Sequence, residues 1–377
     1  MIRDATVVSA VGRRVMDVAI LDGRIAYIGP RPPQPARREI AGMGRFLLPG
    51  AIDLAVALDD ASDAEAWERE TAAAVAAGVT TLVALPHGSD PVRDRESARR
   101  LAQRAARSWC DWGTWVAASC AEAARDAVTS GDALGTFARG DEGLALDCGH
   151  ASVGAVVIAL MDASPCIDTV MRHASSLNGR TNAHLMRVST ATDLGAADRV
   201  RSAGCGPTVG VSLPHLFLAV DESPADVVAS PPIRQDSDRR MLWYTLKRGR
   251  IDTVSSDHHP RASGEGVPGV ARLLPLMLAA ARQGRITWEQ VVAVTADGPA
   301  RVLGATKKGR IELGADADLL LCRETNSSRL PESDWPWGSR EAAPLPEQVL
   351  VRGRVTAHAG QLSATEGNGR QVRGAQA

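Results

Sequence analysis

The sequence has little of what marks several broad classes of protein. Lysine is rare, with three residues among 43 basic ones, and aromatic residues make up only 3% of the 377 positions. No run approaches 18 uninterrupted apolar residues, so we expect no membrane-spanning helix. The formal net charge is −1, whereas nucleic-acid and anionic-membrane binders need a strong basic excess. The N-terminus has no basic-then-apolar leader, so we expect a cytoplasmic protein.

Common catalytic and metal-binding motifs are also absent. The six cysteines are scattered, and none lies in a CxxC or zinc-ribbon spacing. The chain contains no GxSxG, HExxH or GxxxxGK[ST] string, and no glycine-rich strand-to-helix turn matches GxGxxG. These absences remove the common serine-hydrolase, zinc-protease and nucleotide-binding patterns. A cysteine–histidine nucleophile pair stays open, because no local string tests it.

The residues that are present indicate a globular protein of two parts. Apolar residues make up 45% of the chain, enough for a sizeable core. Both ends read as short strands, with Asp22-Gly23 as a hairpin turn. The middle alternates strands and helices, as parallel sheets with crossover helices do. We predict a small β-domain from residues 1–49 and 309–363, a barrel over 50–308 and a flexible polar tail over 364–377.

Within the predicted barrel, residues 63–77 read as a helix that acidic residues open and Gly78 closes. Later strands are expected at 183–189, 206–212 and 251–256. The stretch between Gly149 and His184 reads as two helices joined near Pro165. We therefore expect a (β/α)8 barrel that is slightly truncated, with one strand missing.

Two tryptophan groups are candidate contact surfaces. Trp109, Trp112 and Trp115 have the i, i+3, i+6 spacing of a helix face, and they serve either as core or as an interface anchor. Trp335 and Trp337 flank Pro336 in a loop between the last β-domain strands. We expect that loop to lie near the barrel mouth, where it covers a pocket or meets a partner.

Several strings in a fixed order carry a resemblance. They are DGRIAYIG followed by FLLPGAIDLAV, AAAVAAGVTTLVALPHGSDPVRD, AHLMRVSTATDL, SPPIRQDSDRRMLWYTLKRGRIDTVSSDHHP and KGRIELGADADLLL. Together they resemble the dihydroorotase family of the amidohydrolase superfamily over about nine-tenths of the chain. The resemblance implies an amidohydrolase-type (β/α)8 barrel with a small β-sandwich domain. It also implies hydrolysis of a cyclic amide by two divalent metals, zinc in active relatives, that activate a bridging water.

The first barrel strand departs from the family pattern. Where the family has Asp-x-His-x-His-x-Arg, this chain has Asp53 followed by Ala55, Ala57 and Asp59. A methyl group donates no lone pair to a metal. Asp59 would repel the anionic substrate that the family's arginine holds. Half of the metal site is therefore expected to be absent.

The remaining metal positions are altered as well. No lysine lies in the middle strands, so a carboxylated lysine is excluded there, and of a family aspartate pair only Asp147 survives. Arg187 stands where the family has the histidine before Val-Ser-Thr. The family's catalytic aspartate is retained as Asp257, next to His258. We expect Arg187 to occupy the vacant site and pair with Asp257 or Asp147, because a buried guanidinium needs an anionic partner.

The resemblance and these losses favour a non-catalytic dihydroorotase-like subunit. Similar inactive chains hold aspartate transcarbamoylase in a larger assembly for pyrimidine biosynthesis, so we expect that partner, an oligomeric state and no metal cofactor. One alternative is an active dihydroorotase or related cyclic-amide hydrolase with an unconventional site. Another is a small-molecule sensor or a chaperone-like subunit.

Overall fold

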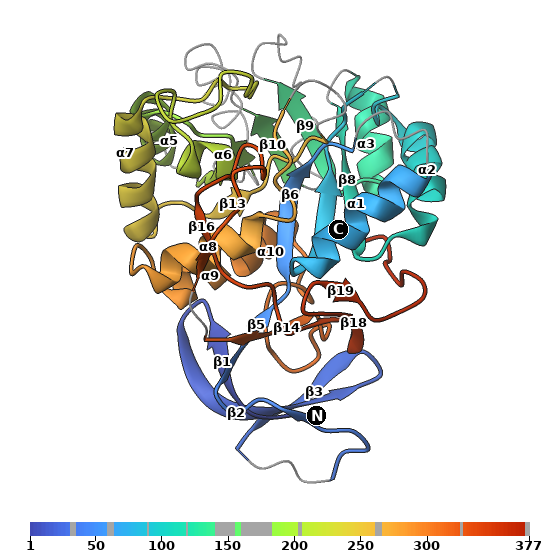
Figure 1. Cartoon of the computed structure of the whole chain (residues 1–377). Coiled ribbons are helices and arrows are strands. Elements are labelled where there is room, and N and C mark those ends of the chain that lie inside the picture. Colours follow the sequence, from blue (N-terminus) through green and yellow to red (C-terminus); the bar gives the residue numbers. More distant parts are fainter. Residues whose placement is uncertain are drawn as a thin grey trace.

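A computed structural model describes residues 1–30, 35–58, 64–88, 90–117, 120–139, 155–159, 183–202, 206–260, 266–324 and 327–373. In these residues a barrel stands on a smaller β-domain that both ends of the chain build (Figure 1). None of the helices in these ranges has the length and apolar character to cross a bilayer.

The β-domain is one nine-stranded sheet in the order β19-β18-β17-β14-β5-β1-β2-β3, with β4 beside β1. Its strands are β1 (Ile2–Ser9), β2 (Gly12–Leu21), β3 (Arg24–Gly29), β4 (Ile40–Ala41), β5 (Arg45–Pro49), β14 (Leu319–Arg323), β17 (Gln348–Val351), β18 (Arg354–His358) and β19 (Gln361–Leu362). The antiparallel pair β5–β14 joins the two ends of the chain. The predicted Asp22-Gly23 hairpin turn is confirmed, and both residues have positive φ, as a tight two-residue turn requires.

The barrel has eight parallel strands in sequence order. They are β6 (Ala51–Val56), β7 (Val79–Ala84), β8 (Asp111–Ala117), β9 (Gly135–Arg139), β10 (Ala155–Ala159), β11 (Ala183–Met186), β12 (Thr208–Ser212) and β13 (Thr253–Ser255). The first and last strands meet just beyond β13, where the amide of Ala57 donates to the carbonyl of His258 at 2.8 Å and the amide of His258 to that of Ala55 at 3.1 Å. The barrel is therefore closed.

The expectation of a missing strand was wrong. Ala155–Ala159 forms β10 and pairs with β9 on one side and β11 on the other. Its sequence, AVVIA, is a short apolar run, and periodicity alone does not separate a buried strand from a buried helix. Pairing with two neighbouring strands decides the matter.

Helices surround the strands, and the predicted helix over 63–77 is confirmed as α1 (Ala64–Ala76). The others are α2 (Arg95–Arg104), α3 (Ala121–Thr129), α5 (Ala191–Ser202), α6 (Leu213–Phe217), α7 (Asp236–Lys247), α8 (Leu273–Arg282), α9 (Trp288–Val292) and α10 (Gly298–Val302). Asp94 caps α2 in a reciprocal capping box with Ser97. A short hairpin of β15 (Ser328–Arg329) and β16 (Glu341–Ala342) packs against α8.

The first tryptophan group lies in strand β8 and just before it, not on a helix. Trp112 and Trp115 are three residues apart in a strand and so point to opposite faces. Trp112 makes an edge contact with Trp67 of α1, with 5.7 Å between ring centroids. All three tryptophans are buried, which agrees with the core interpretation and leaves no exposed anchor here.

The second tryptophan group is also less exposed than expected. Trp337 is fully buried, and its indole N–H donates to the carbonyl of Pro268 at 2.6 Å. Trp335 is half-buried and donates to the Asp226 carboxylate at 2.9 Å. Trp337 is therefore a core residue and does not form the surface anchor that was predicted.

The expected flexible tail is largely docked. The amide of Trp112 donates to the carbonyl of Arg370, and the amide of Val372 donates back to Trp112, at 3.0 and 2.7 Å. The amide of Gly369 donates to Ser108 at 2.8 Å. These bonds give partners to backbone N–H and C=O groups at and just before the start of β8. The composition of the tail does not reveal such pairing. Residues 374–377 lie outside the described ranges.

Candidate functional site

The positions of the two missing histidines lie inside the barrel. Ala55 lies in β6 and Ala57 just beyond it, and a register irregularity interrupts the pairing of β6 with β7 between Asp53 and Val56. Both alanines are fully buried. They belong to one apolar cluster with Trp115 of β8 and Met186 of β11. This part of the barrel interior offers methyl and aromatic groups in place of metal ligands.

Trp115 is the largest side chain of that cluster and is completely buried. Its indole N–H donates to the carbonyl of Leu54 at 2.9 Å, which fixes the ring against β6. Phe137 of β9 belongs to the same cluster. The sequence did not reveal this role, because the helix-like spacing of the tryptophans concealed that β8 is a strand.

Asp53 is retained from the family pattern and has a structural role. Its Oδ1 accepts hydrogen bonds from the amides of Ala55 at 3.2 Å and Ser256 at 3.0 Å, which ties β6 to the end of β13. Burial raises the pKa of this carboxyl to about 6. Its Oδ2 has no hydrogen-bond partner among the described residues.

Arg187 and Asp257 form the ion pair that the sequence predicts. The distances from Asp257 Oδ1 to Arg187 Nη2 and Nε are 2.6 and 2.9 Å. Only 9% of the arginine side chain and 7% of the aspartate side chain are exposed. Both residues also have left-handed backbone, with φ of 64° and 52°. Non-glycine residues in that region are strained and gather at functional sites.

His258 is engaged by backbone and by a carboxylate. Its Nδ1 accepts from the amides of Gly269 and Val270 at 3.1 and 3.3 Å, so the ring proton sits on Nε2. That Nε2 lies 3.3 Å from Oε2 of Glu70 on α1. Although burial opposes it, this contact lowers the pKa of Glu70. His258 therefore serves the closure of the barrel, with Nδ1 hydrogen-bonded to backbone amides and Nε2 facing Glu70.

The other described histidines of the barrel have separate hydrogen-bond and packing partners, although His215 and His259 lie within electrostatic reach of Asp257 and Arg187. His184 lies between Thr208 and Thr253, 2.9 and 3.2 Å from their hydroxyl oxygens, and burial lowers its pKa to about 3. His259 packs edge-on against His87 with ring centroids 4.7 Å apart, and burial lowers its pKa to about 4. No motif in the sequence had indicated the His87–His259 contact.

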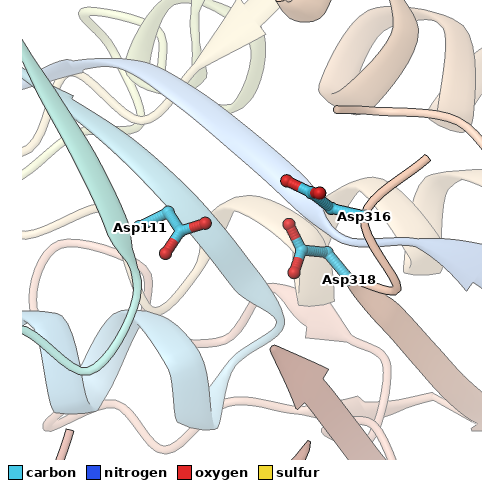
Figure 2. Close-up of side chains that lie close together, drawn as sticks. All are labelled: Asp111, Asp316 and Asp318. Atoms are coloured by element: carbon cyan, nitrogen blue, oxygen red, sulfur yellow. The ribbon is translucent and has the colours of Figure 1, made fainter. Parts of the chain in front are cut away.

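The residues that the structure describes contain one group of three candidate metal ligands, and it lies elsewhere. Asp111, Asp316 and Asp318 turn their carboxylates toward one another where β8 begins beside the β-domain (Figure 2). The ammonium of Lys308 bonds to Asp111, and lies 3.0 Å from Asp316 and 2.6 Å from Asp318. Burial lowers the pKa of Lys308, but the three carboxylates outweigh it and raise that pKa. The lysine thus supplies the cation that this cluster needs.

The described residues at the barrel mouth do not fit the zinc pair of active relatives. Alanine offers no donor atom, and a guanidinium cannot coordinate a cation. The predicted residues Asp59 and Asp147 lie outside the described ranges. Of the predicted site, the structure brings together Arg187 and Asp257, and it places Ala55 and Ala57 in the same barrel interior.

Comparisons with known proteins show what the chain is similar to. Residues 180–336 match the model of the amidohydrolase family. A dihydroorotase of Halobacterium salinarum is 29% identical, covering 97% of this chain and 98% of the relative. An allantoinase of Rubrobacter xylanophilus is 27% identical over 96% of this chain and 95% of the relative. The solved L-hydantoinase (dihydropyrimidinase) of Arthrobacter aurescens superposes with a TM-score of 0.86 at 21% identity, covering 99% of both chains. That likeness confirms the predicted fold, a barrel with an additional β-domain.

Proposed function

We propose that this chain, an amidohydrolase-family homologue of dihydroorotases, hydantoinases and allantoinases, has lost metal-dependent hydrolysis and acts as a structural partner of aspartate transcarbamoylase. The observation that carries the loss is the Arg187–Asp257 ion pair, because it engages the retained catalytic aspartate with a fixed cation. In an active relative a metal ion would supply that positive charge.

Volume supports the same proposal. Trp115 shares one buried cluster with the two alanines that replace histidines. Apolar side chains thus pack in the part of the barrel where two histidines and their metal ions would lie in an active relative. A barrel core and outer surface do not depend on the metal site, so the fold can persist as a scaffold after its chemistry is lost.

The partnership rests on the resemblance to inactive dihydroorotase-like subunits. Its test is copurification of the untagged protein with aspartate transcarbamoylase from the same organism, with zinc measured in the same sample. We expect a stable complex and well under one zinc per chain. Stoichiometric, tightly bound zinc would overturn the loss of the metal site. Assembly of the transcarbamoylase that is unchanged when this chain is deleted would overturn the scaffold role.

The alternative is an active cyclic-amide hydrolase with an unconventional site. The retained and buried Asp257 is the observation in its favour. The decisive variant is Asp257→Asn, which keeps the shape of the side chain and removes its charge. Loss of a measurable dihydroorotate, hydantoin or allantoin turnover in this variant, with the fold intact by circular dichroism, would establish the alternative. We expect no turnover in either protein.

A further inference from the structure

A basic groove lies where the barrel meets the β-domain, near the beginning of β8. It runs between the segment after α10, the start of β3 and the docked C-terminal segment, and encloses about 350 Å³. Four of its cations are exposed at the rim: Arg24, Lys307, Arg370 and Arg373. None of the four forms an ion pair with a residue that the structure describes.

Many arginines elsewhere in the described residues are matched with carboxylates, for example Arg45 with Glu347 and Arg272 with Asp334 at 2.7 and 2.8 Å. Others, such as Arg14 and Arg354, are exposed and form no ion pair with a described residue, so an unmatched cation alone marks no site. The whole chain has a formal charge of −1. What distinguishes the groove is that four unmatched cations gather in one concave place, where the walls focus their field.

The floor of the groove does not cancel this charge. Lys308 and Arg352 lie there, and they bind the three carboxylates of Figure 2: Asp111, Asp316 and Asp318. Two cations thus face three carboxylates, which leaves at most one negative charge against the four cations of the rim. Burial raises the pKa of Asp318, which reduces even that charge.

The backbone around the groove is held in place before any ligand arrives. The amide of Arg370 donates to the Asp111 carboxylate at 2.8 Å, and its carbonyl accepts from Trp112. The amide of Asp316 donates to the carbonyl of Lys307 at 2.9 Å. Arg24 begins β3, and its backbone forms an isolated antiparallel β-bridge with the backbone of Asp316. Cations carried on fixed backbone need little ordering when they bind an anion.

We propose that this groove binds a small molecule that carries a phosphate or diphosphate group. Its volume is at the lower end of small-ligand pockets, which suits a compact anion better than a protein segment. Guanidinium groups bind phosphate oxygens in pairs of parallel hydrogen bonds. The site is separate from the barrel mouth and does not depend on the proposed loss of hydrolysis.

The test is calorimetric titration of the full chain with inorganic pyrophosphate, comparing wild type with the double variant Arg370→Gln, Arg373→Gln. We expect saturable 1:1 binding that weakens as salt is added, since exposed charges are screened. Losing two guanidiniums should weaken binding by about tenfold or more. The matched control is Arg14→Gln, which removes an exposed arginine of β2 outside the groove and should leave the affinity unchanged.

Three results would overturn the proposal. One is no saturable binding by wild type, and another is equal binding by the double variant whose melting temperature matches wild type. The third is capture of a glutamate-rich peptide by the groove when pyrophosphate does not bind, because that would assign the surface to an acidic protein partner.

Discussion

Removing one member of the Arg187–Asp257 pair should destabilise the fold strongly. In Arg187→Ala the Asp257 carboxylate stays buried without its described cation. Breaking a buried ion pair in this way typically costs about 3–5 kcal/mol. A chain of 377 residues has an unfolding entropy of about 0.8 kcal/mol/K at about 2.1 cal/mol/K per residue. The expected fall in melting temperature is therefore about 4–6 °C.

A double-mutant cycle separates charge pairing from packing. Arg187→Met combined with Asp257→Leu removes both charges and keeps apolar bulk, and such replacements are often close to neutral. We expect the double variant to be more stable than either single variant in urea unfolding. Arg14→Ala, on an exposed strand position, should stay within about 0.5 kcal/mol of wild type.

The backbone at Arg187 allows a further comparison. Its φ of 64° is costly for any residue with a Cβ and free for glycine. Arg187→Gly loses the same charge as Arg187→Ala but relieves this strain, so it should be more stable than the alanine variant by about 1 kcal/mol. A melting temperature of Arg187→Ala equal to wild type, or strictly additive effects in the cycle, would refute the reasoning.

Three other variants test the interior. Trp115→Ala empties a fully buried site and should cost about 3–5 kcal/mol in chemical unfolding; the half-buried Trp335→Ala should cost less, and equal losses would contradict the packing assigned to Trp115. Burial raises the pKa of Asp53 from an ordinary 3.8 to about 6, so the native state favours the protonated carboxyl. The free energy of unfolding of wild type should therefore fall by about 3 kcal/mol as pH rises from about 4 to about 6. Asp53→Asn should lack this loss, and parallel stability–pH curves would contradict it. Lys308→Met leaves three carboxylates facing one another, so their pKa values should rise on folding. The melting temperature of this variant should then increase from pH 7 to pH 5 more than that of wild type. An equal response would exclude Lys308 as the cation that neutralises the cluster.

Local patterns predicted much of the fold. The hairpin turn at Asp22-Gly23 and the helix α1 follow from turn chemistry and helix-ending signals within a few residues. The pairing of the two chain ends followed from strand-like patterns at both ends, and β5–β14 confirms it. These features depend on short-range preferences that a sequence displays directly.

Features that depend on distant contacts were missed. Lys308 meets Asp111 across 197 positions of the chain, and neither residue lies in a motif. The C-terminal segment looks like a flexible tail by composition, yet its backbone pairs with Trp112. The run AVVIA reads equally as helix or strand until β9 and β11 lie beside it. Tertiary pairing, not local preference, decides each of these cases.

At the candidate site, the resemblance located the positions and physical chemistry gave the contact. Arg187 was expected to pair with Asp257 because a buried guanidinium needs an anion, and the two lie 2.6 Å apart. Nothing in the sequence placed Trp115 beside Ala55 and Ala57, since only the barrel brings β8 and β6 to one cluster. The ion pair was therefore predictable from the sequence, whereas the position of the Trp115 ring was not.

The substitutions in the barrel fit one another in both charge and volume. Arg187 supplies a cation to Asp257, and Trp115 packs in one cluster with the small side chains of Ala55 and Ala57. Returning a histidine to Ala55 alone would force extra volume into a filled core, which typically costs about 1–3 kcal/mol. The Asp257 carboxylate would still be engaged by the Arg187 guanidinium. Each change thus makes reversal of the others unfavourable, and this mutual dependence is the physical argument for the proposed loss of hydrolysis.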